Sequence, residues 1–257
     1  MVGETSIANA NGRVIANTII RGAINFIEKQ PTAVVSSIDE SNRVWSSLLV
    51  GDFGFVRVPS PGKLVFDKSM VKSTTSDILY NNLQQHPAMG TLFIELSSRR
   101  RFRLNGKAQD SPNEITLDVV EAYPNCPKYI QRRVLSVPGH FQKTEAKKVT
   151  GTILGDDLHD WILDADTFFV GSADSTKNLD VSHRGGNKGF IEIMGNGKLK
   201  IPDYQGNSMY NTLGNLLVNP SVGLLFVDFE HGDTLQLTGK GELNFGQNTS
   251  QDLEKTS

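Results

Sequence analysis

The feature that most constrains the fold of this 257-residue chain is an internal repeat. Val35–Phe66 aligns with Val170–Ile201 at a constant offset of 135 residues. After a slip of two residues the match resumes at an offset of 133, so that Pro87 aligns with Pro220. The match extends over about seventy residues, which is longer than one supersecondary unit, so we expect each copy to form a whole small domain.

The two copies differ most in one short segment. The first copy reads Trp45-Ser-Ser-Leu-Leu-Val-Gly where the second reads Asp180-Val-Ser-His-Arg-Gly-Gly. Polar and charged groups stand in the second copy where apolar groups stand in the first. This pattern indicates a ligand in the second copy.

The composition excludes several classes of protein. A formal charge of −2 gives no bulk reason to expect nucleic acid or an anionic membrane as a partner. No apolar run approaches the roughly 20 residues that a membrane-spanning helix needs, and the polar start lacks the order of a signal peptide. The single cysteine, Cys126, excludes an internal disulfide and fits a reducing compartment. We therefore expect a cytoplasmic protein.

Apolar periodicity and turn residues predict a mostly β chain with a few helices. Helices are expected at 12–29, 76–86 and 208–218, with a short one from Gly155. The expected strands are Ala33–Ile38, Val44–Val50, Gly54–Val58, Lys63–Phe66, Met89–Leu96, Arg101–Ala108 and Glu114–Ala122, and then Thr167–Ala173, Leu179–Arg184, Gly189–Met194, Lys198–Ile201, Val222–Phe229 and Thr234–Asn244. Consecutive short strands with one inserted helix predict a small antiparallel barrel in each copy.

The domain organisation follows from the repeat. We expect a first barrel with a leading helix at 1–137, a linker at 138–155, a second barrel at 156–246 and a disordered tail at 247–257. The strand predicted at Glu114–Ala122 has no counterpart in the second copy. The second barrel is therefore either one strand short or covered at that edge by another element.

Polar residues of the second copy have the chemistry of a phosphate site. Arg184 offers bidentate charge-assisted bonds, the neighbouring glycines let backbone N–H groups approach an anion, and the predicted helix start at Asn207-Ser208 adds its dipole. Asp203 and Tyr204 suit a flat polar ring system. The alternative is two glycine-rich hairpin turns whose polar residues face solvent.

The order of elements and the motifs of the second copy resemble the pyridoxamine 5'-phosphate oxidase-related FMN-binding family. The motifs that carry the resemblance are Phe169-Val-Gly-Ser-Ala-Asp, Asp180-Val-Ser-His-Arg-Gly-Gly, Gly189-Phe, Ile201-Pro-Asp-Tyr-Gln-Gly-Asn, Asn211-Thr-Leu-Gly-Asn-Leu, Asn219-Pro, Gly223-Leu-Leu-Phe-Val-Asp-Phe and Leu235-Gln-Leu-Thr-Gly. More narrowly, the chain is similar to a tandem branch that carries a run like Asn125-Cys-Pro-Lys-Tyr-Ile-Gln between the copies. The resemblance implies two tandem split β-barrels, FMN at the seam between them, and a flavoprotein that is usually dimeric.

The resemblance also implies which residues hold the flavin. Ser182 to Gly185 would line it, Asp203 and Tyr204 would lie beside its ring or ribityl chain, and Asn207-Ser208 would lie near its phosphate. The full set of expected cofactor-binding residues is Ser182, His183, Arg184, Gly185, Asp203, Tyr204, Asn207, Ser208, Asn211 and Asn215, with Arg101, Arg103 and Tyr129 as further candidates.

The chain also departs from the pyridoxamine phosphate oxidases themselves. Gly206-Asn-Ser stands where those enzymes place an Arg-Lys pair for the flavin phosphate, and their C-terminal Trp and Arg segment is absent. Oxidation of vitamin B6 is therefore not expected.

Three other features have more than one interpretation. Arg99, Arg101 and Arg103 share one face of a predicted strand, and they suit a solvated edge strand, a nucleic-acid patch, or contact with a flavin phosphate held by the second copy. Cys126 is either a thiol near the ligand or a small buried residue that starts a short helix. His183 could bond a flavin carbonyl, donate a proton, or be a satisfied strand histidine.

These observations predict an FMN-dependent oxidoreductase acting on an unidentified small molecule, with the flavin held mainly by the second barrel and closed in by the first. The alternatives are a flavin-binding or electron-transfer module without a substrate, and a haem-binding split barrel. No metal site is expected, because the five histidines and the single cysteine show no ligand spacing. The expected partners are a small-molecule substrate or a redox partner and a second copy of the chain.

Overall fold

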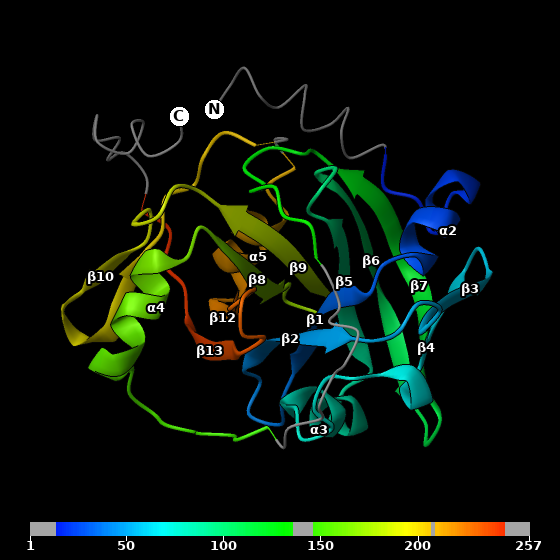
Figure 1. The fold of residues 1–257 in the computed structure, drawn as a ribbon, viewed down its shortest axis with the longest axis horizontal. Helices are drawn as coiled ribbons and strands as arrows, with labels where there is room; N and C mark the ends of the chain where they lie inside the picture. Colours follow the sequence, from blue (N-terminus) through cyan, green and yellow to red (C-terminus); the bar gives the residue numbers. More distant parts are fainter. Residues whose placement is uncertain (1–13, 136–145, 207–208, 245–257) are drawn as a thin grey trace.

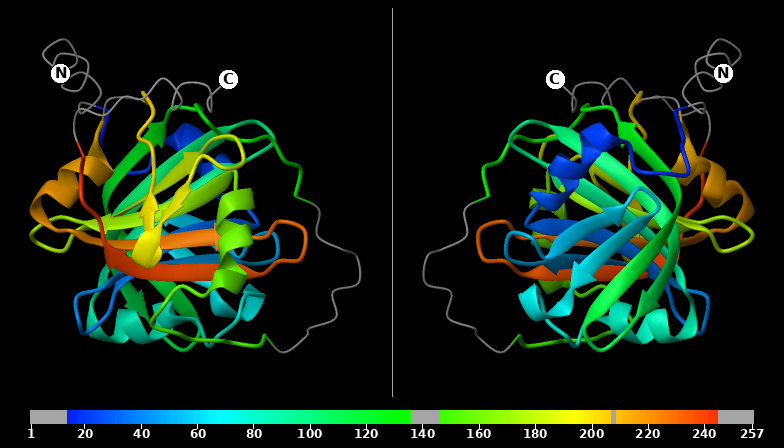
Figure 2. Two further views of the ribbon diagram at one scale, coloured as in Figure 1. Left: turned by 90° about the vertical axis from the view of Figure 1, so that its left-hand side faces the viewer. Right: turned by 90° about the vertical axis from the view of Figure 1, so that its right-hand side faces the viewer.

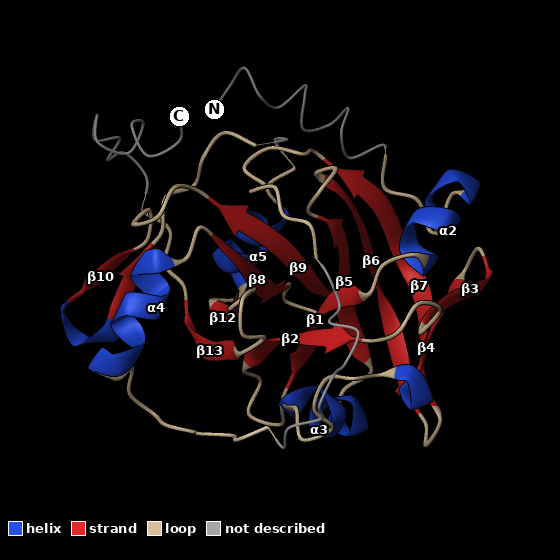
Figure 3. Cartoon of the chain, viewed as in Figure 1, coloured by secondary structure: helices blue, strands red, loops and turns tan. Residues whose placement is uncertain are grey.

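A computed structural model describes residues 14–135, 146–206 and 209–244. Strands dominate, and a few short helices lie at the ends and edges of the sheets (Figures 1 and 3). The elements of the first copy are α2 (Arg21–Glu28), β1 (Thr32–Ile38), β2 (Val44–Val50), β3 (Val56–Ser60), β4 (Lys63–Asp67), η1 (Lys68–Met70), α3 (Ile78–Gln85), β5 (Ala88–Glu95), β6 (Arg100–Asp110) and β7 (Glu114–Asn125). Those of the second copy are η2 (Asp156–Leu158), α4 (His159–Asp164), β8 (Thr167–Ala173), β9 (Leu179–Gly185), β10 (Glu192–Met194), η3 (Gly195–Gly197), β11 (Lys198–Lys200), α5 (Asn211–Val218), β12 (Ser221–Val227) and β13 (Thr234–Lys240). The expected mostly β architecture is confirmed.

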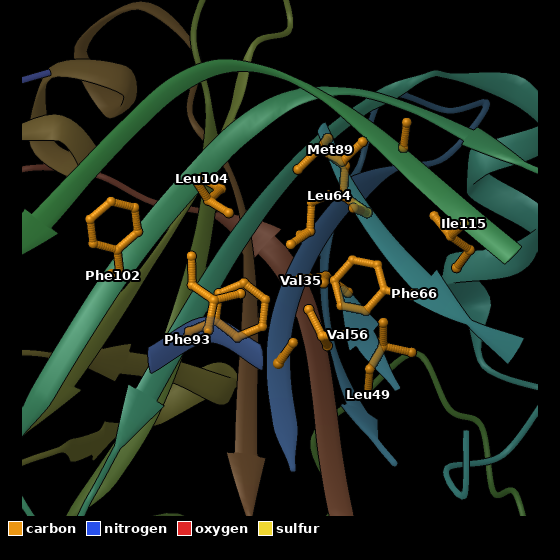
Figure 4. Packing of buried hydrophobic residues seen from close by; sticks show 14 of the residues in the cluster. Val35, Leu49, Val56, Leu64, Phe66, Met89, Phe93, Phe102, Leu104 and Ile115 are labelled. Carbon is orange, nitrogen blue, oxygen red and sulfur yellow. The ribbon is translucent and has the colours of Figure 1, made fainter. Parts of the chain in front are cut away.

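The first copy is a seven-stranded antiparallel sheet in the order β2-β1-β5-β6-β7-β4-β3. The sheet curls until Gly51, after β2, forms an isolated bridge with Val71, after β4. Its concave face encloses a core of aliphatic and aromatic side chains, with α2 and α3 packed against it (Figure 4). Phe66 lies near the centre of this core and stacks on Phe93 with 6.3 Å between ring centroids.

The second copy repeats the order but has fewer strands in its main sheet. A four-stranded sheet runs β13-β12-β8-β9, and β10 pairs only with β11. In the first copy β7 joins β6 to β4, and the described part of the second copy contains no strand in that place. Within the described residues this outcome agrees with the first of the two alternatives, a second barrel that is one strand short.

The missing strand leaves part of the second core open. Leu235 and Leu237 of β13 are only partly buried, whereas their counterparts Phe102 and Leu104 in β6 are 4% and 0% exposed. Strands β11 and β4 differ in burial in the same way, because β4 has three buried residues and β11 has none. The second copy therefore encloses its apolar residues less completely than the first.

The two copies pack against each other where β1 and β2 lie beside β8, β9 and β12 (Figures 1 and 2). Gly90 of β5 lies against Asp180 of β9, where an added Cβ would be 3.0 Å from the Asp180 backbone. Gly223 of β12 lies against Trp45 of β2, where an added Cβ would be 2.6 Å from the Trp45 Cα. The repeat offsets relate Gly90 to Gly223 and Trp45 to Asp180, so each copy offers the same surface to the other.

An apolar layer fills the space between the two copies. Val34 and Leu92 of the first copy pack with Phe169, Val181 and Leu225 of the second. This packing fixes the strands of the first copy relative to those of the second, and the site described below lies between them. No helix in the described ranges is long and apolar enough to cross a membrane.

Several predicted boundaries are wrong. The helix expected at 12–29 begins only at Arg21, because Ala16 instead forms an isolated β-bridge with Ala122. The helix expected from residue 76 begins at Ile78, after Asp77, whose carboxylate caps it by accepting from the Leu79 N–H. The helix expected from residue 208 begins at Asn211, and the expected strand ends at Gly54, Gly189 and Asn244 lie outside β3, β10 and β13.

Candidate functional site

A polar pocket lies at the seam between the two copies. Strand β6 of the first copy forms one side, and β9 together with the start of α5 forms the other. Its lining residues are Arg101, Arg103, Asn125, Lys128, Tyr129, Ser182, His183, Arg184, Gly185, Phe190, Pro202, Asp203, Tyr204, Gly206, Tyr210, Asn211, Thr212 and Leu213. The pocket volume is about 90 Å³, smaller than the roughly 300–1,000 Å³ of pockets that bury a drug-sized ligand.

Arg103 connects the two copies at the floor of the pocket. It is 5% exposed, and its Nη1 lies 3.0 Å from Asp180 Oδ1 in a buried ion pair. The same guanidinium donates to Tyr123 Oη at 3.1 Å and to Ser182 Oγ at 2.8 Å. Burial lowers the pKa of Arg103, but the attraction of Asp180 outweighs it and the pKa is raised on balance. This arginine is therefore charged and fixed in place.

The Tyr123 hydroxyl extends this network to α5. It donates to Asp180 Oδ1 at 3.3 Å and accepts from Asn211 Nδ2 at 2.8 Å. Thr212 Oγ1 bonds Ser182 Oγ at 3.0 Å. Because both bonds reach the first turn of α5, the network holds that turn against β9.

Arg101 is the least compensated charge in the pocket. No carboxylate forms an ion pair with it within the described part of the chain, and its Nε atom is buried without a partner. Burial, with the repulsion of Arg103, lowers the pKa of Arg101 to about 10. Arg101 is partly buried, and a cation withdrawn from water without a counterion is costly unless a ligand supplies the opposite charge.

His183 is held in one tautomer by Arg101. Arg101 Nη1 lies 3.2 Å from His183 Nδ1, and a guanidinium can only donate, so Nδ1 accepts and the proton resides on Nε2. Burial, with the charges of Arg101, Arg184 and Arg133, lowers the pKa of His183 well below its usual value. The ring is neutral at pH 7, and its buried Nε2–H has no acceptor among the described residues.

The remaining charges leave the pocket positive. Arg184 Nη1 lies 3.3 Å from Asp203 Oδ1, and burial lowers the pKa of Arg184. Lys128 Nζ donates to the Gln205 carbonyl at 3.3 Å. Among the described residues, four cations line the pocket and two carboxylates pair with them, so these residues give the site an excess of two positive charges.

Aromatic rings form the outer wall of the pocket. The rings of Tyr129 and Tyr204 lie 5.3 Å apart, and the Tyr129 hydroxyl donates to the Gln205 carbonyl at 2.9 Å. An added Cβ on Gly185 would lie 2.1 Å from the Tyr129 carbonyl oxygen. Only glycine at position 185 allows the Tyr129 segment to approach β9 this closely.

The structure brings most of the predicted site residues together. Ser182, His183, Arg184, Gly185, Asp203, Tyr204, Asn211, Arg101, Arg103 and Tyr129 all line the pocket. Asn215 does not, because its amide donates to Ser172 Oγ at 3.0 Å inside the second copy. Asn207 and Ser208 lie outside the described residues.

The arginine run is not a solvated edge strand. Strand β6 lies between β5 and β7, and Arg99 is in a turn with φ 59°. Cys126 is half-buried, and no helix starts there, so the alternative in which it begins a short helix is wrong.

Sequence reasoning missed the roles of Tyr123, Asp180 and Thr212. Asp180 stands in the motif that begins Asp180-Val-Ser-His. A charged residue there, aligned with the apolar Trp45 of the first copy, was the signal that could have identified its role. Tyr123 belongs to a strand of the first copy, and only the packing of the two copies brings it to the site.

Comparisons with known proteins give a distant likeness. No model of a known protein family matches the sequence, and no curated protein matches it. Among solved structures, HupZ of Group A Streptococcus aligns at 11% identity over 41% of this chain and 93% of its own, with a TM-score of 0.34. An FMN-binding protein of Syntrophomonas wolfei aligns at 11% identity over 48% and 93%, with a TM-score of 0.31. A pyridoxamine 5'-phosphate oxidase-related FMN-binding protein of Nostoc punctiforme aligns at 18% identity over 36% and 49%, with a TM-score of 0.27. The interpretation of the site therefore rests on its own residues.

Proposed function

We propose that this protein binds FMN non-covalently in the pocket between β6 and β9 and uses it as an oxidoreductase on a small molecule. The second copy supplies most of the contacts through β9, Asp203, Tyr204 and the start of α5. The first copy closes the site through β6 and Tyr129.

The observation that carries the proposal is an excess of positive charge in the pocket between the two copies, together with buried hydrogen-bond donors that have no acceptor among the described residues. An excess of two positive charges suits a phosphate monoester, which carries nearly two negative charges at pH 7. The buried Nε atoms of Arg101 and Arg103 and the Nε2–H of His183 offer donors that lack acceptors. Riboflavin, which has no phosphate, would leave the same charges unpaired.

The residues present fit FMN in chemistry, and the small enclosed volume limits how it is held. The enclosed part is large enough for an anionic group only. The ring system would lie on the open side of the pocket against Tyr129 and Tyr204, whose rings, tilted by 37° to each other, supply apolar faces for stacking. When bound, FMN would supply electron or hydride transfer.

The protein's own residues would bind and orient the cofactor. Arg101 and Arg103 would hold the anion, and the Asp180–Tyr123 network would fix their geometry. His183 would donate a hydrogen bond from Nε2 and would not transfer a proton, because its pKa is lowered well below neutral pH. Of the roles considered for His183, the proposal therefore uses the hydrogen bond.

The haem alternative receives no support from His183. An imidazole that binds iron presents a nitrogen lone pair, but Nδ1 of His183 accepts from Arg101 and Nε2 carries the proton. A carrier of electrons without a substrate remains the other candidate, and turnover with small reductants or oxidants separates it from an enzyme.

The test is retention of flavin by the purified protein. Protein mixed with FMN or with riboflavin is desalted, and the two visible absorption bands of oxidised flavin are measured in the protein fraction. We expect FMN to be retained by the wild type and lost from Arg101→Met and Arg184→Ala. Arg57→Ala is the matched control, because the Arg57 side chain is 53% exposed and remote from the pocket. Absence of retained FMN in the wild type would refute the proposal.

A further inference from the structure

The internal repeat gives the pocket residues of β6, β9 and α5 counterparts in the other copy. The offset of 133 relates Arg103 to Gln236, and the offset of 135 relates Ser182 to Ser47. The start of α5 corresponds to the start of α3, and Tyr210 to Asp77. A second location with the geometry of the pocket therefore exists between β13 and β2.

The same hydrogen bond is present at both locations. Arg103 Nη2 donates to Ser182 Oγ at 2.8 Å, and Gln236 Nε2 donates to Ser47 Oγ at 2.9 Å. In both cases the donor crosses from one copy to the other. The counterpart location is therefore built in the same way as the pocket.

At the counterpart location the carboxylate of Asp77 accepts from three donors. The Leu79 N–H at the start of α3 donates at 2.8 Å, Ser47 Oγ at 2.6 Å and Gln236 Nε2 at 3.0 Å. An anionic oxygen pair therefore sits where a helix N-terminus, a serine and a side chain from the other copy converge.

In the pocket the corresponding donors are the Thr212 N–H, Ser182 and Arg103, and the position of Asp77 is held by Tyr210. Arg103 and Ser182 bond instead to Asp180 of β9, which aligns with Trp45 and lies away from the start of the helix in the sequence. No side chain caps α5 among the described residues. Two further polar groups of the pocket, Arg103 Nε and His183 Nε2, are buried without partners, and both residues are 5% exposed.

The counterpart location has also lost the positive charges. Thr234 stands for Arg101, Leu49 for Arg184, and Leu48 for His183. None of these three counterparts is charged, and the Asp77 carboxylate is already present there.

We propose that the Asp77 carboxylate occupies in the first copy the position that the ligand's anionic group takes in the second, so that the chain fills one of its two equivalent sites itself and binds one ligand. The stoichiometry rests on the proposed function, whereas the role of Asp77 does not.

The role of Asp77 is tested by removing its side-chain carboxylate and supplying acetate, a free carboxylate, in solution. Thermal unfolding of the wild type, Asp77→Ala and Asp77→Asn is followed in sodium acetate and in sodium chloride at equal ionic strength. Acetate bound in the second copy would raise all three midpoints alike. We expect an additional rise of several degrees only in Asp77→Ala, because in Asp77→Asn the amide still fills the space. An equal response of the three proteins overturns the proposal.

The stoichiometry is measured on the wild type, so it does not depend on a variant that folds. Equilibrium dialysis with FMN is expected to give one flavin per chain, and inorganic phosphate is expected to compete with it. Two flavins per chain, or phosphate that does not compete, overturns the proposal while leaving FMN binding intact. If the wild type binds no FMN, the proposed function fails, and the acetate experiment still decides the role of Asp77.

Discussion

Replacing Arg101 with methionine should stabilise the ligand-free protein and weaken FMN binding. Burial lowers the pKa of Arg101 from 12.5 to about 10, and each unit corresponds to about 1.4 kcal/mol, so the buried charge costs roughly 3 kcal/mol. The unfolded chain holds this proton more tightly than the folded one. The cost is therefore present at pH 7 and is relieved only as the pH rises through 10.

Part of this gain is offset in the variant. The hydrogen bond to His183 Nδ1 is lost, and leaving that acceptor unpaired costs about 1–2 kcal/mol. The net stabilisation of Arg101→Met should be roughly 1–2 kcal/mol. For a chain of this length, each kcal/mol raises the thermal unfolding midpoint by about 2–4 °C. Differential scanning calorimetry without ligand measures this shift, with the exposed Arg57→Met as the control.

FMN affinity should change in the opposite direction. Loss of a hydrogen bond to a charged group costs about 1.5–3 kcal/mol, or roughly 10- to 150-fold in affinity. Fluorescence titration should show this loss for FMN and little change for riboflavin. The reasoning is refuted if the ligand-free variant unfolds at a lower temperature, or if both flavins lose affinity by the same factor.

Three further changes test the packing and charge of the seam. Because the pKa of His183 is lowered in the folded state, the unfolded chain binds a proton below about pH 6.5 that the folded chain does not bind. Urea unfolding should therefore show that the free energy of unfolding decreases as the pH is lowered below this value, by up to about 1.4 kcal/mol per pH unit. His183→Asn should remove this component of the pH dependence. Gly223→Ala should destabilise by about 1–3 kcal/mol in chemical denaturation because its Cβ would meet the Trp45 backbone, whereas Gly239→Ala, which has open space, should change stability by less than about 1 kcal/mol. Asp180→Asn should cost about 3–5 kcal/mol because it leaves its arginine partner buried and unpaired, and a loss below about 1 kcal/mol would contradict the ion pair.

The repeat predicted the order of elements well because apolar spacing and turn residues are local. Strands β1 and β8, and β2 and β9, begin at positions 135 residues apart, as the alignment requires. The leading helix was predicted too long, since Ala16 pairs with Ala122, a residue over one hundred positions away. Helix periodicity carries no information about such a distant partner.

The site was predictable on the side of the second copy and less so on the side of the first. Ser182 to Gly185 stand in one motif, and the structure places all four in the pocket. Arg101 and Arg103 had three interpretations, because a run of arginines on a strand does not reveal which strands flank it. Tyr123 gave no signal at all, since an apolar strand position with a hydroxyl suits many environments.

Joining the two copies in one chain has a consequence for the contact between Gly90 and Asp180 and its counterpart between Gly223 and Trp45. In an assembly of two identical chains, every residue at such a contact occurs twice, so a change that benefits one side is imposed on the other. A single polypeptide is free of this restriction. One side of its axis can hold an acid that neutralises an arginine, while the other holds an indole that donates to Asp39 of its own copy. Covalent linkage thus lets the chain specialise one half for binding and the other for support.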